Sequence, residues 1–253
     1  MSSDNLVKSL DRALQIFEVL GSRRGGYGVT EISKEIGLNK TSVYRMLSTF
    51  VRHGYVEQDA EKYKLGYKVL ELSSALLESI DLRTEAKPFL KELGNVTNEV
   101  IHLVVYDRGE VVYIEKLEGN ETLRMHSKVG TRAPMHCTGF GKVIMAYLPS
   151  AEVAKIIDRQ PMEAYTINTI VDKNELLENL QEIKRKGFAY DLEENELGIS
   201  CIAAPIFEHT GKVVAAVSIS GPTMRMTTER LAELQEHIMD IANKISGRLG
   251  YRT

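Results

Sequence analysis

Residues 29–64 constrain the fold of this 253-residue chain more than any other stretch, because they predict two short helices, a tight turn between them and a small hairpin. Val29, Ile32 and Ile36 place apolar side chains on one face of the first helix, and a Gly-Leu pair ends it. Asn39 then suits the N-cap of the second helix, because its side-chain oxygen can accept a hydrogen bond from a free backbone N–H.

The second helix is amphipathic and has a cationic polar face. Its apolar residues recur at intervals of three and four and predict one buried stripe: Val43, Met46, Leu47, Phe50 and Val51. The opposite face carries Lys40, Thr41, Tyr44, Arg45, Ser48 and Arg52, and residues 39–54 include no acid. Two closely joined helices of this kind are typical of a unit that places its second helix in the major groove of DNA.

The charge distribution agrees with that interpretation, although the formal net charge of the whole chain is −3. Residues 1–64 contain ten Lys and Arg against eight Asp and Glu, whereas the remaining residues contain 22 against 27. A basic surface attached to an acidic body is compatible with DNA binding, because only the segment that meets the phosphates must be cationic.

Several other classes of protein are disfavoured by the sequence. The two cysteines, Cys137 and Cys201, lie far apart and predict neither a disulfide framework nor a zinc finger, and the six histidines show no metal-ligand spacing. We expect no metal and no cofactor. The N-terminus lacks a signal segment and no apolar run approaches the roughly 20 residues needed to cross a bilayer. We therefore expect a cytoplasmic protein that does not bind membranes.

The rest of the N-terminal region completes a winged helix-turn-helix domain at residues 1–66. A helix over 6–22 is expected to bury one face made of Leu10, Ala13, Leu14, Phe17 and Leu20. Residues 55–58 and 62–65 read as the strands of a wing, in which Lys62 can meet DNA. A connecting helix over 67–80 carries Val69, Leu70 and Leu72; it packs either on its own domain or on the same helix of a second subunit.

The C-terminal domain, residues 81–253, is predicted to combine an antiparallel sheet with flanking helices in an α+β fold. Its first helix, over 82–94, should be kinked or interrupted at Pro88. Strands are expected at 100–106, 111–117, 188–192, 199–207 and 213–220, and helices at 139–147, 150–159, 173–186 and 227–249.

Taken together, eight groups of residues resemble the IclR family of bacterial transcriptional regulators. The N-terminal groups are Ser9–Ala13, Leu38–Arg45 and Lys64–Gly66, and the C-terminal ones include Gly130–His136, Gly139–Lys142, Gly187–Asp191, Gly198–Pro205 and Ser218–Pro222. They occur in the family's order over about residues 6–250. Each string alone is a weak signal, and their common register makes the resemblance specific.

The resemblance implies a winged helix-turn-helix domain, a connecting helix and a GAF-like effector-binding domain. It implies a homodimer or dimer of dimers that represses or activates transcription under the control of a small metabolite. By position, the family's effector-contacting residues fall on Gly139, Phe140, Asp191, Cys201, Ser218 and Ser220. The family often has a small residue where Phe140 stands, so the pocket of this chain is expected to be narrower or more apolar.

Physical reasoning about these residues favours an organic acid as the effector, with structural alternatives left open. Gly139 begins a helix, whose free N–H groups suit a carboxylate, and the alternative is a glycine turn needed only for close packing. Ser218 and Ser220 share one face of a strand, where their hydroxyl groups either contact a polar ligand or form local hydrogen bonds within the sheet. Asp191 would repel a carboxylate unless the ligand also offers hydroxyl or hydrate donors.

The DNA-contacting residues expected from both lines of reasoning are Lys40, Thr41, Ser42, Tyr44, Arg45, Ser48, Arg52 and Lys62. Arg45 and Thr41 are the expected base readers, and Lys40 and Arg52 the expected phosphate contacts. Two alternatives for the C-terminal domain are a module that serves only oligomerisation and a GAF-type thiol enzyme. The enzyme is disfavoured because His136 and Cys137 are neighbours in an extended segment and their side chains point apart.

Overall fold

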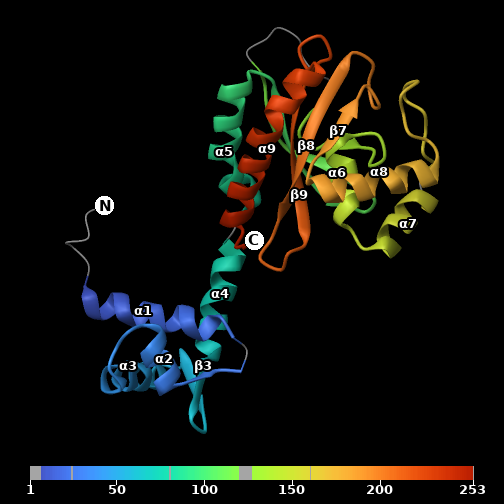
Figure 1. Ribbon diagram of the computed structural model, residues 1–253. Coiled ribbons are helices and arrows are strands. Elements are labelled where there is room, and N and C mark those ends of the chain that lie inside the picture. Colours follow the sequence, from blue (N-terminus) through green and yellow to red (C-terminus); the bar gives the residue numbers. More distant parts are fainter. Residues whose placement is uncertain (1–6, 24, 80, 120–126, 160, 253) are drawn as a thin grey trace. The chain divides into compact units, whose positions relative to one another are not determined.

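The computed structural model describes residues 7–23, 25–79, 81–119, 127–159 and 161–252, so residues 1–6 and 80 of the expected domains lie outside the described residues. The chain divides into two compact units, Met1–Ile80 and Asp81–Thr253. The expected α+β fold is confirmed, with a helix-turn-helix unit followed by a sheet covered by helices (Figure 1).

The first unit packs three helices on a three-stranded sheet. The helices are α1 (Lys8–Gly21), α2 (Val29–Glu35) and α3 (Lys40–Arg52). The wing strands β2 (Val56–Asp59) and β3 (Lys62–Leu65) pair antiparallel as expected, and β3 also pairs with the short β1 (Tyr27–Gly28), which the sequence did not reveal. Helix α4 (Tyr67–Ser79) follows the wing.

The core of this unit corrects two expectations about apolar faces. Ile16 and Leu20 are the buried residues of α1, whereas Leu10 and Leu14 are 58% and 54% exposed. On α3, Val43 and Leu47 are fully buried and Val51 at the helix end is exposed. The exposure at the start of α1 and at the end of α3 has one cause: the core of this unit is small and does not extend along the whole length of either helix. The predicted burial of Leu10, Leu14 and Val51 was therefore wrong.

The second unit is built on a six-stranded antiparallel sheet in the order β6-β5-β4-β9-β8-β7. Its strands are β4 (Val100–Asp107), β5 (Glu110–Leu117), β6 (Arg132–Ala133), β7 (Ala189–Leu192), β8 (Ile199–Phe207) and β9 (Val213–Pro222). The predicted central hairpins are confirmed, while β6 was not foreseen because two residues give no periodic signal.

Helices cover both faces of this sheet (Figure 1). Helices α5 (Leu82–Thr97) and α9 (Thr228–Arg248) pack together on one face, and α6 (Gly139–Tyr147) packs on the other with α8 (Lys173–Lys186) behind it; α7 is Ser150–Arg159. Helix α5 continues through Pro88, so the expected interruption was wrong. Proline removes one N–H bond from a helix, and the buried Ala86, Leu90 and Leu93 hold this one in place.

A β-bulge in β5 determines which side chains reach the α6 face. Leu103 lies opposite Glu115 and Val104 lies opposite Tyr113, so Ile114 is the extra residue. The extra residue reverses the alternation of side chains along β5. As a result Tyr113 faces α6 and contacts Phe140, whereas Glu115 bonds Arg83 of α5.

Candidate functional site

Helix α3 presents the polar face that the sequence predicted. Asn39 caps it by accepting a hydrogen bond from Ser42 N at 2.8 Å, and Val43 and Leu47 anchor its inner side with no exposed area. The exposed residues of the opposite face are Lys40, Thr41, Tyr44, Arg45, Ser48 and Arg52, while Ser42 at the cap is half-buried. The outer face of α3 is therefore open to solvent within its unit.

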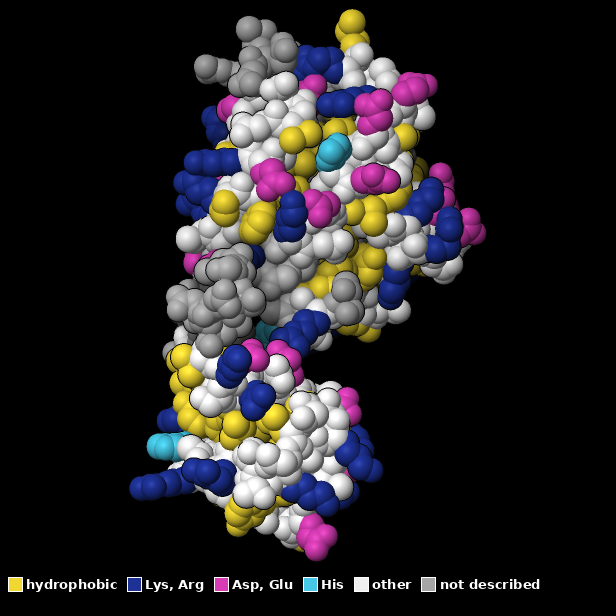
Figure 2. All heavy atoms as spheres, turned by 60° about the vertical axis from the view of Figure 1, so that its left-hand side comes forward, with side chains coloured by type: hydrophobic (Ala, Val, Ile, Leu, Met, Phe, Trp, Pro, Cys, Tyr) yellow, Lys and Arg dark blue, Asp and Glu magenta, His cyan; other side chains and the backbone are white. Residues whose placement is uncertain are grey.

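The cations of this face are available to an external anion. Within the described ranges, Lys40, Arg45 and Arg52 form no ion pair with a carboxylate. Tyr44 lies among them with 55% of its surface exposed. Figure 2 shows Lys and Arg side chains of the helix-turn-helix unit projecting from its surface. A helix with unpaired cations and an exposed aromatic side chain suits the polyanionic groove of DNA.

The wing contributes less free charge than its lysines suggest. Lys64 pairs with Glu57 of the neighbouring strand at 3.3 Å, so its charge is neutralised inside the wing. Lys62 is exposed and lies across from Asp59 in the register of the hairpin. Lys62 is thus the wing lysine that remains a candidate for a phosphate contact.

A cavity of about 290 Å³ opens on the α6 face of the sheet in the second unit. Its walls come from strands β4, β5, β8 and β9, the turn before α6 and the segment after β7. The lining residues include His102, Tyr113, Ser127, Arg132, Phe140, Asp191, Asn195, Glu196, Cys201 and Ser220. By comparison with a cavity of roughly 150 Å³ that holds benzene, this volume suits a ligand of about ten heavy atoms.

Four of the six expected effector contacts lie in this cavity wall, and two do not. Phe140, Asp191, Cys201 and Ser220 line the cavity, although they come from four different elements. Gly139 lies behind Phe140 against Ala189 and Ala203, and Ser218 is completely buried in β9. The structure therefore brings a subset of the expected residues together and leaves Gly139 and Ser218 outside the lining.

Phe140 forms the apolar part of the wall together with two aromatic rings that the sequence analysis missed. Tyr113 and Phe140 meet edge to face with their ring centroids 5.4 Å apart, and Tyr113 meets His102 at 5.1 Å. His102 was detectable as the polar member of an otherwise apolar strand. Tyr113 was not, because only the bulge places it on this face.

Asp191 is the buried carboxylate of the cavity, with 3% of its surface exposed. Its Oδ1 accepts hydrogen bonds from Glu194 N at 2.8 Å and Asn195 N at 3.4 Å. Burial raises its pKa to about 7, although the hydrogen bond from Glu194 and the charge of Lys142 act in the opposite direction. Asp191 therefore both shapes the segment after β7 and faces the ligand space.

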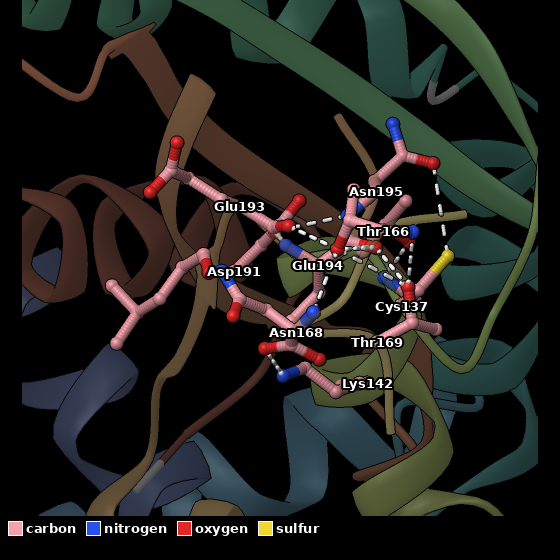
Figure 3. A network of polar contacts seen from close by, with 12 residues as sticks. Cys137, Lys142, Thr166, Asn168, Thr169, Asp191, Glu193, Glu194 and Asn195 are labelled. Atoms are coloured by element: carbon pink, nitrogen blue, oxygen red, sulfur yellow. Dashed lines mark hydrogen bonds and ion pairs between the residues drawn. The ribbon is translucent and has the colours of Figure 1, made fainter. Parts of the chain in front are cut away.

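A buried polar network holds the segment after β7, residues 193–195, in place (Figure 3). Lys142 of α6 forms an ion pair with Glu194, and both side chains are almost fully buried. Thr166 Oγ1 donates to Glu193 O at 2.6 Å and Thr169 Oγ1 donates to Glu194 O at 2.6 Å. The network fixes the backbone that carries Asp191 and Asn195 into the cavity wall.

The N-terminus of α6 is already capped by protein atoms. Thr138 accepts a hydrogen bond from Gly141 N at 3.2 Å and donates one to Pro134 O at 2.7 Å. A Cβ on Gly141 would lie 2.4 Å from Met135 O, so this glycine is required by close packing. Close packing therefore explains the glycine at position 141. Of the first three residues of α6, Phe140 is the one that lines the cavity.

The two cysteines lack the properties of catalytic thiols. Burial raises the pKa of Cys137 to about 12, and burial also raises the pKa of Cys201, which a hydrogen bond from Ser220 only partly offsets. A nucleophilic cysteine needs a lowered pKa. Among the described residues, no group of three His, Cys, Asp or Glu side chains is placed to hold a metal ion. No described helix has the length and hydrophobicity to span a membrane.

Two family models match the chain. The bacterial transcriptional regulator IclR C-terminal domain matches residues 74–247, and the IclR helix-turn-helix domain matches residues 9–60. The transcriptional regulator XynR of Escherichia coli is 36% identical over 97% of this chain and 98% of its own length. The regulator KdgR of the same species is 38% identical over 97% of this chain and 94% of its own length.

Solved structures agree in fold. The IclR protein of Thermotoga maritima covers 97% of this chain and 100% of its own, with 32% identity and a TM-score of 0.66. The repressor BlcR of Agobacterium tumefaciens covers 99% of this chain and 100% of its own, with a TM-score of 0.87. Its identity of 24% supports a likeness in fold alone. The resemblance indicated by the sequence motifs is confirmed.

Proposed function

The chain belongs to the IclR family of bacterial transcriptional regulators, and we propose that a small hydroxylated organic acid, bound in the cavity of the second unit, controls its binding to an operator. As a member of the family it is a DNA-binding regulator of transcription, and its relatives are named as transcriptional regulators rather than as enzymes.

The outer face of α3 is the proposed reader of the operator. Arg45 and Thr41 lie at positions from which side chains reach base edges, whereas Lys40 and Arg52, at the two ends of the helix, contact phosphates. Ser42, Tyr44 and Ser48 complete this surface, and Lys62 adds a backbone contact from the wing. The supporting observation is that the unpaired cations and the exposed polar side chains share one face.

The effector is proposed to be a carboxylate that also carries hydroxyl or hydrate groups. Asp191 in the cavity wall accepts hydrogen bonds from a ligand hydroxyl, and Arg132 at the cavity edge supplies a positive charge. Arg132 is partly neutralised by Asp107 and Glu110, so its attraction for an anion is moderate. Phe140, Asp191, Cys201 and Ser220 are the proposed contacts within the wall, while Gly139 and Ser218 would support it from behind.

One observation carries this proposal: a cavity of about 290 Å³ that combines a buried carboxylate with an aromatic wall. A melting-temperature screen of small hydroxy acids tests it, because a bound ligand stabilises the folded protein in proportion to the logarithm of its concentration. Hits are then tested for a change in DNA affinity. If no acid shifts the melting temperature, the C-terminal domain serves assembly alone; if a hit is turned over, the domain is an enzyme.

A second copy of the chain is the proposed partner of the exposed apolar residues in the first unit. Tyr67 and Leu70 of α4 are 75% and 61% exposed, and Leu10 and Leu14 of α1 are more than half exposed. The two residues of each pair are neighbours on the surface of their own helix, and exposed apolar surface of this kind indicates an interaction site. A homodimer or dimer of dimers, acting in the cytoplasm, would cover it; Leu70→Glu should lower the molar mass measured by light scattering.

A further inference from the structure

His102 is a buried polar residue of the cavity wall that the family resemblance did not assign. It lies on β4 with 3% of its surface exposed. Its Nε2 lies 2.8 Å from Ser127 Oγ, and its Nδ1 lies 3.4 Å from Ser218 Oγ and 3.3 Å from Ser220 Oγ. Three hydroxyl groups, one from the segment before β6 and two from β9, therefore converge on one imidazole.

The imidazole is neutral at physiological pH. Burial, together with the positive charge of Lys116 on the neighbouring strand, lowers the pKa of His102 to about 3. A neutral imidazole has one N–H donor and one acceptor nitrogen. The position of its hydrogen therefore decides the direction of all three hydrogen bonds.

Ser218 decides which nitrogen carries the hydrogen. Its side chain is fully buried, and within the described part of the chain His102 Nδ1 is the partner of its hydroxyl. A buried hydroxyl whose hydrogen has no acceptor is strongly disfavoured. Ser218 therefore donates to Nδ1, and the hydrogen of the ring lies on Nε2, where it is donated to Ser127 Oγ.

This arrangement makes the part of the cavity wall formed by His102 and Ser220 an acceptor, whereas the Ser127 hydroxyl, which accepts from Nε2–H, keeps its own hydrogen. Nδ1 is an acceptor, so it cannot donate to a ligand. The Ser220 hydroxyl points its hydrogen at Nδ1 or at the Cys201 sulfur, to which it is also hydrogen-bonded, and its oxygen lone pairs remain for the cavity. Asp191, a second acceptor, lines the same cavity.

We propose that His102, held with its hydrogen on Nε2, is a specificity-determining residue that makes this wall accept hydrogen bonds from the hydroxyl end of the effector and exclude its carboxylate. The inference rests on the proposed effector function and adds the orientation of the ligand to it. His102 acts through Ser220 and is a positioning residue.

Nuclear magnetic resonance of the full-length protein with ¹⁵N-labelled histidine tests the position of the hydrogen. Long-range ¹H–¹⁵N correlations distinguish the two neutral forms of an imidazole, and His102→Asn identifies the signals of His102. We expect the hydrogen on Nε2 in the wild type and a growing Nδ1–H population in Ser218→Ala. Ser246→Ala removes another fully buried hydroxyl, on α9, and serves as the matched control that should leave His102 unchanged.

A wild-type protein with the hydrogen on Nδ1, or a Ser218→Ala variant with unchanged His102 signals, would overturn the inference. Both results are independent of any ligand, so they are distinguishable from a failure of the proposed effector class.

Calorimetry with D-glycerate, propionate and glycerol then tests the orientation. We expect glycerate to bind at least about tenfold more tightly than propionate, because propionate lacks hydroxyl groups and would leave the buried acceptors of this wall without donors. Ser218→Ala should shrink that preference, although Ser218 does not touch the cavity. An undiminished preference in that variant contradicts the role of His102, and absence of binding by all three compounds counts against the hydroxy-acid effector.

Discussion

Replacing Lys142 by Met should destabilise the second unit strongly and in a pH-dependent way. The Lys142 side chain is 2% exposed and pairs with Glu194, whose side chain is 9% exposed. Removal of one partner leaves a buried carboxylate without its counter-ion, and breaking such a pair costs about 3–5 kcal/mol. Against a total stability of about 5–15 kcal/mol for a typical domain, this is a large fraction.

The pH dependence follows from Glu194, whose pKa is raised by burial although Lys142 lowers it. Without Lys142 the pKa of Glu194 rises further, so the folded variant binds a proton that the unfolded chain releases. The stability of the variant therefore falls as the pH rises from the ordinary glutamate range to the new folded pKa. The loss relative to wild type should be larger at pH 8 than at pH 5.5.

Urea unfolding followed by circular dichroism measures this effect, since the chain has no tryptophan to report by fluorescence. With a slope near 2 kcal/mol per molar urea, the midpoint of the affected transition should fall by roughly 1.5–2.5 M at pH 8. Lys91→Met, on the exposed side of α5, is the matched control and should change little. A Lys142→Met midpoint equal to the control, or a loss independent of pH, would refute the reasoning.

Three further predictions concern single residues. Asp191→Asn keeps an acceptor for Glu194 N but removes a carboxyl whose folded pKa is about 7. In urea titrations the wild type should therefore lose up to about 4 kcal/mol of stability between pH 4 and pH 7, and the variant should not. The variant should also bind the effector more weakly in calorimetry, and a pH profile equal to that of the wild type would contradict the effect of burial on Asp191. Arg52→Ala should weaken binding to all DNA sequences and lower the salt slope by about 1, whereas Arg45→Ala should relax preference at particular base pairs; gel-shift series with the opposite pattern would reverse the assignment. Asn39→Ala removes the cap of α3 and should cost the first unit about 1 kcal/mol in thermal unfolding, with a smaller loss expected for Asn39→Ser, and equal losses would point away from the cap.

Local sequence patterns predicted most of the helices and strands, because their determinants lie within a few residues. Asn39, Val43 and Leu47 specify α3 by capping and periodicity, and the structure places them as expected. The exposure of Leu10 and Leu14 was missed because periodicity identifies an apolar face but not how far the core extends along it.

The cavity was predictable only in part. Strand alternation put Ser218 and Ser220 on one face, but the bulge at Ile114 that turns Tyr113 toward Phe140 depends on the pairing of two strands. The Lys142–Glu194 pair joins residues 52 positions apart, and no local pattern signals it. Long-range contacts of this kind appear only once the chain has folded.

The most direct test of the account measures DNA binding by the outer face of α3. A duplex selected from a random library by the wild-type protein is titrated by fluorescence anisotropy with the triple variant Lys40→Ala, Arg45→Ala, Arg52→Ala, and with Arg12→Ala, an exposed cation of α1, as control. We expect the triple variant to bind more than about 100-fold more weakly, with a salt slope lower by about 2 because Lys40 and Arg52 are the phosphate contacts, and the control to bind as the wild type does. Equal affinity of the triple variant and the control would contradict the central claim.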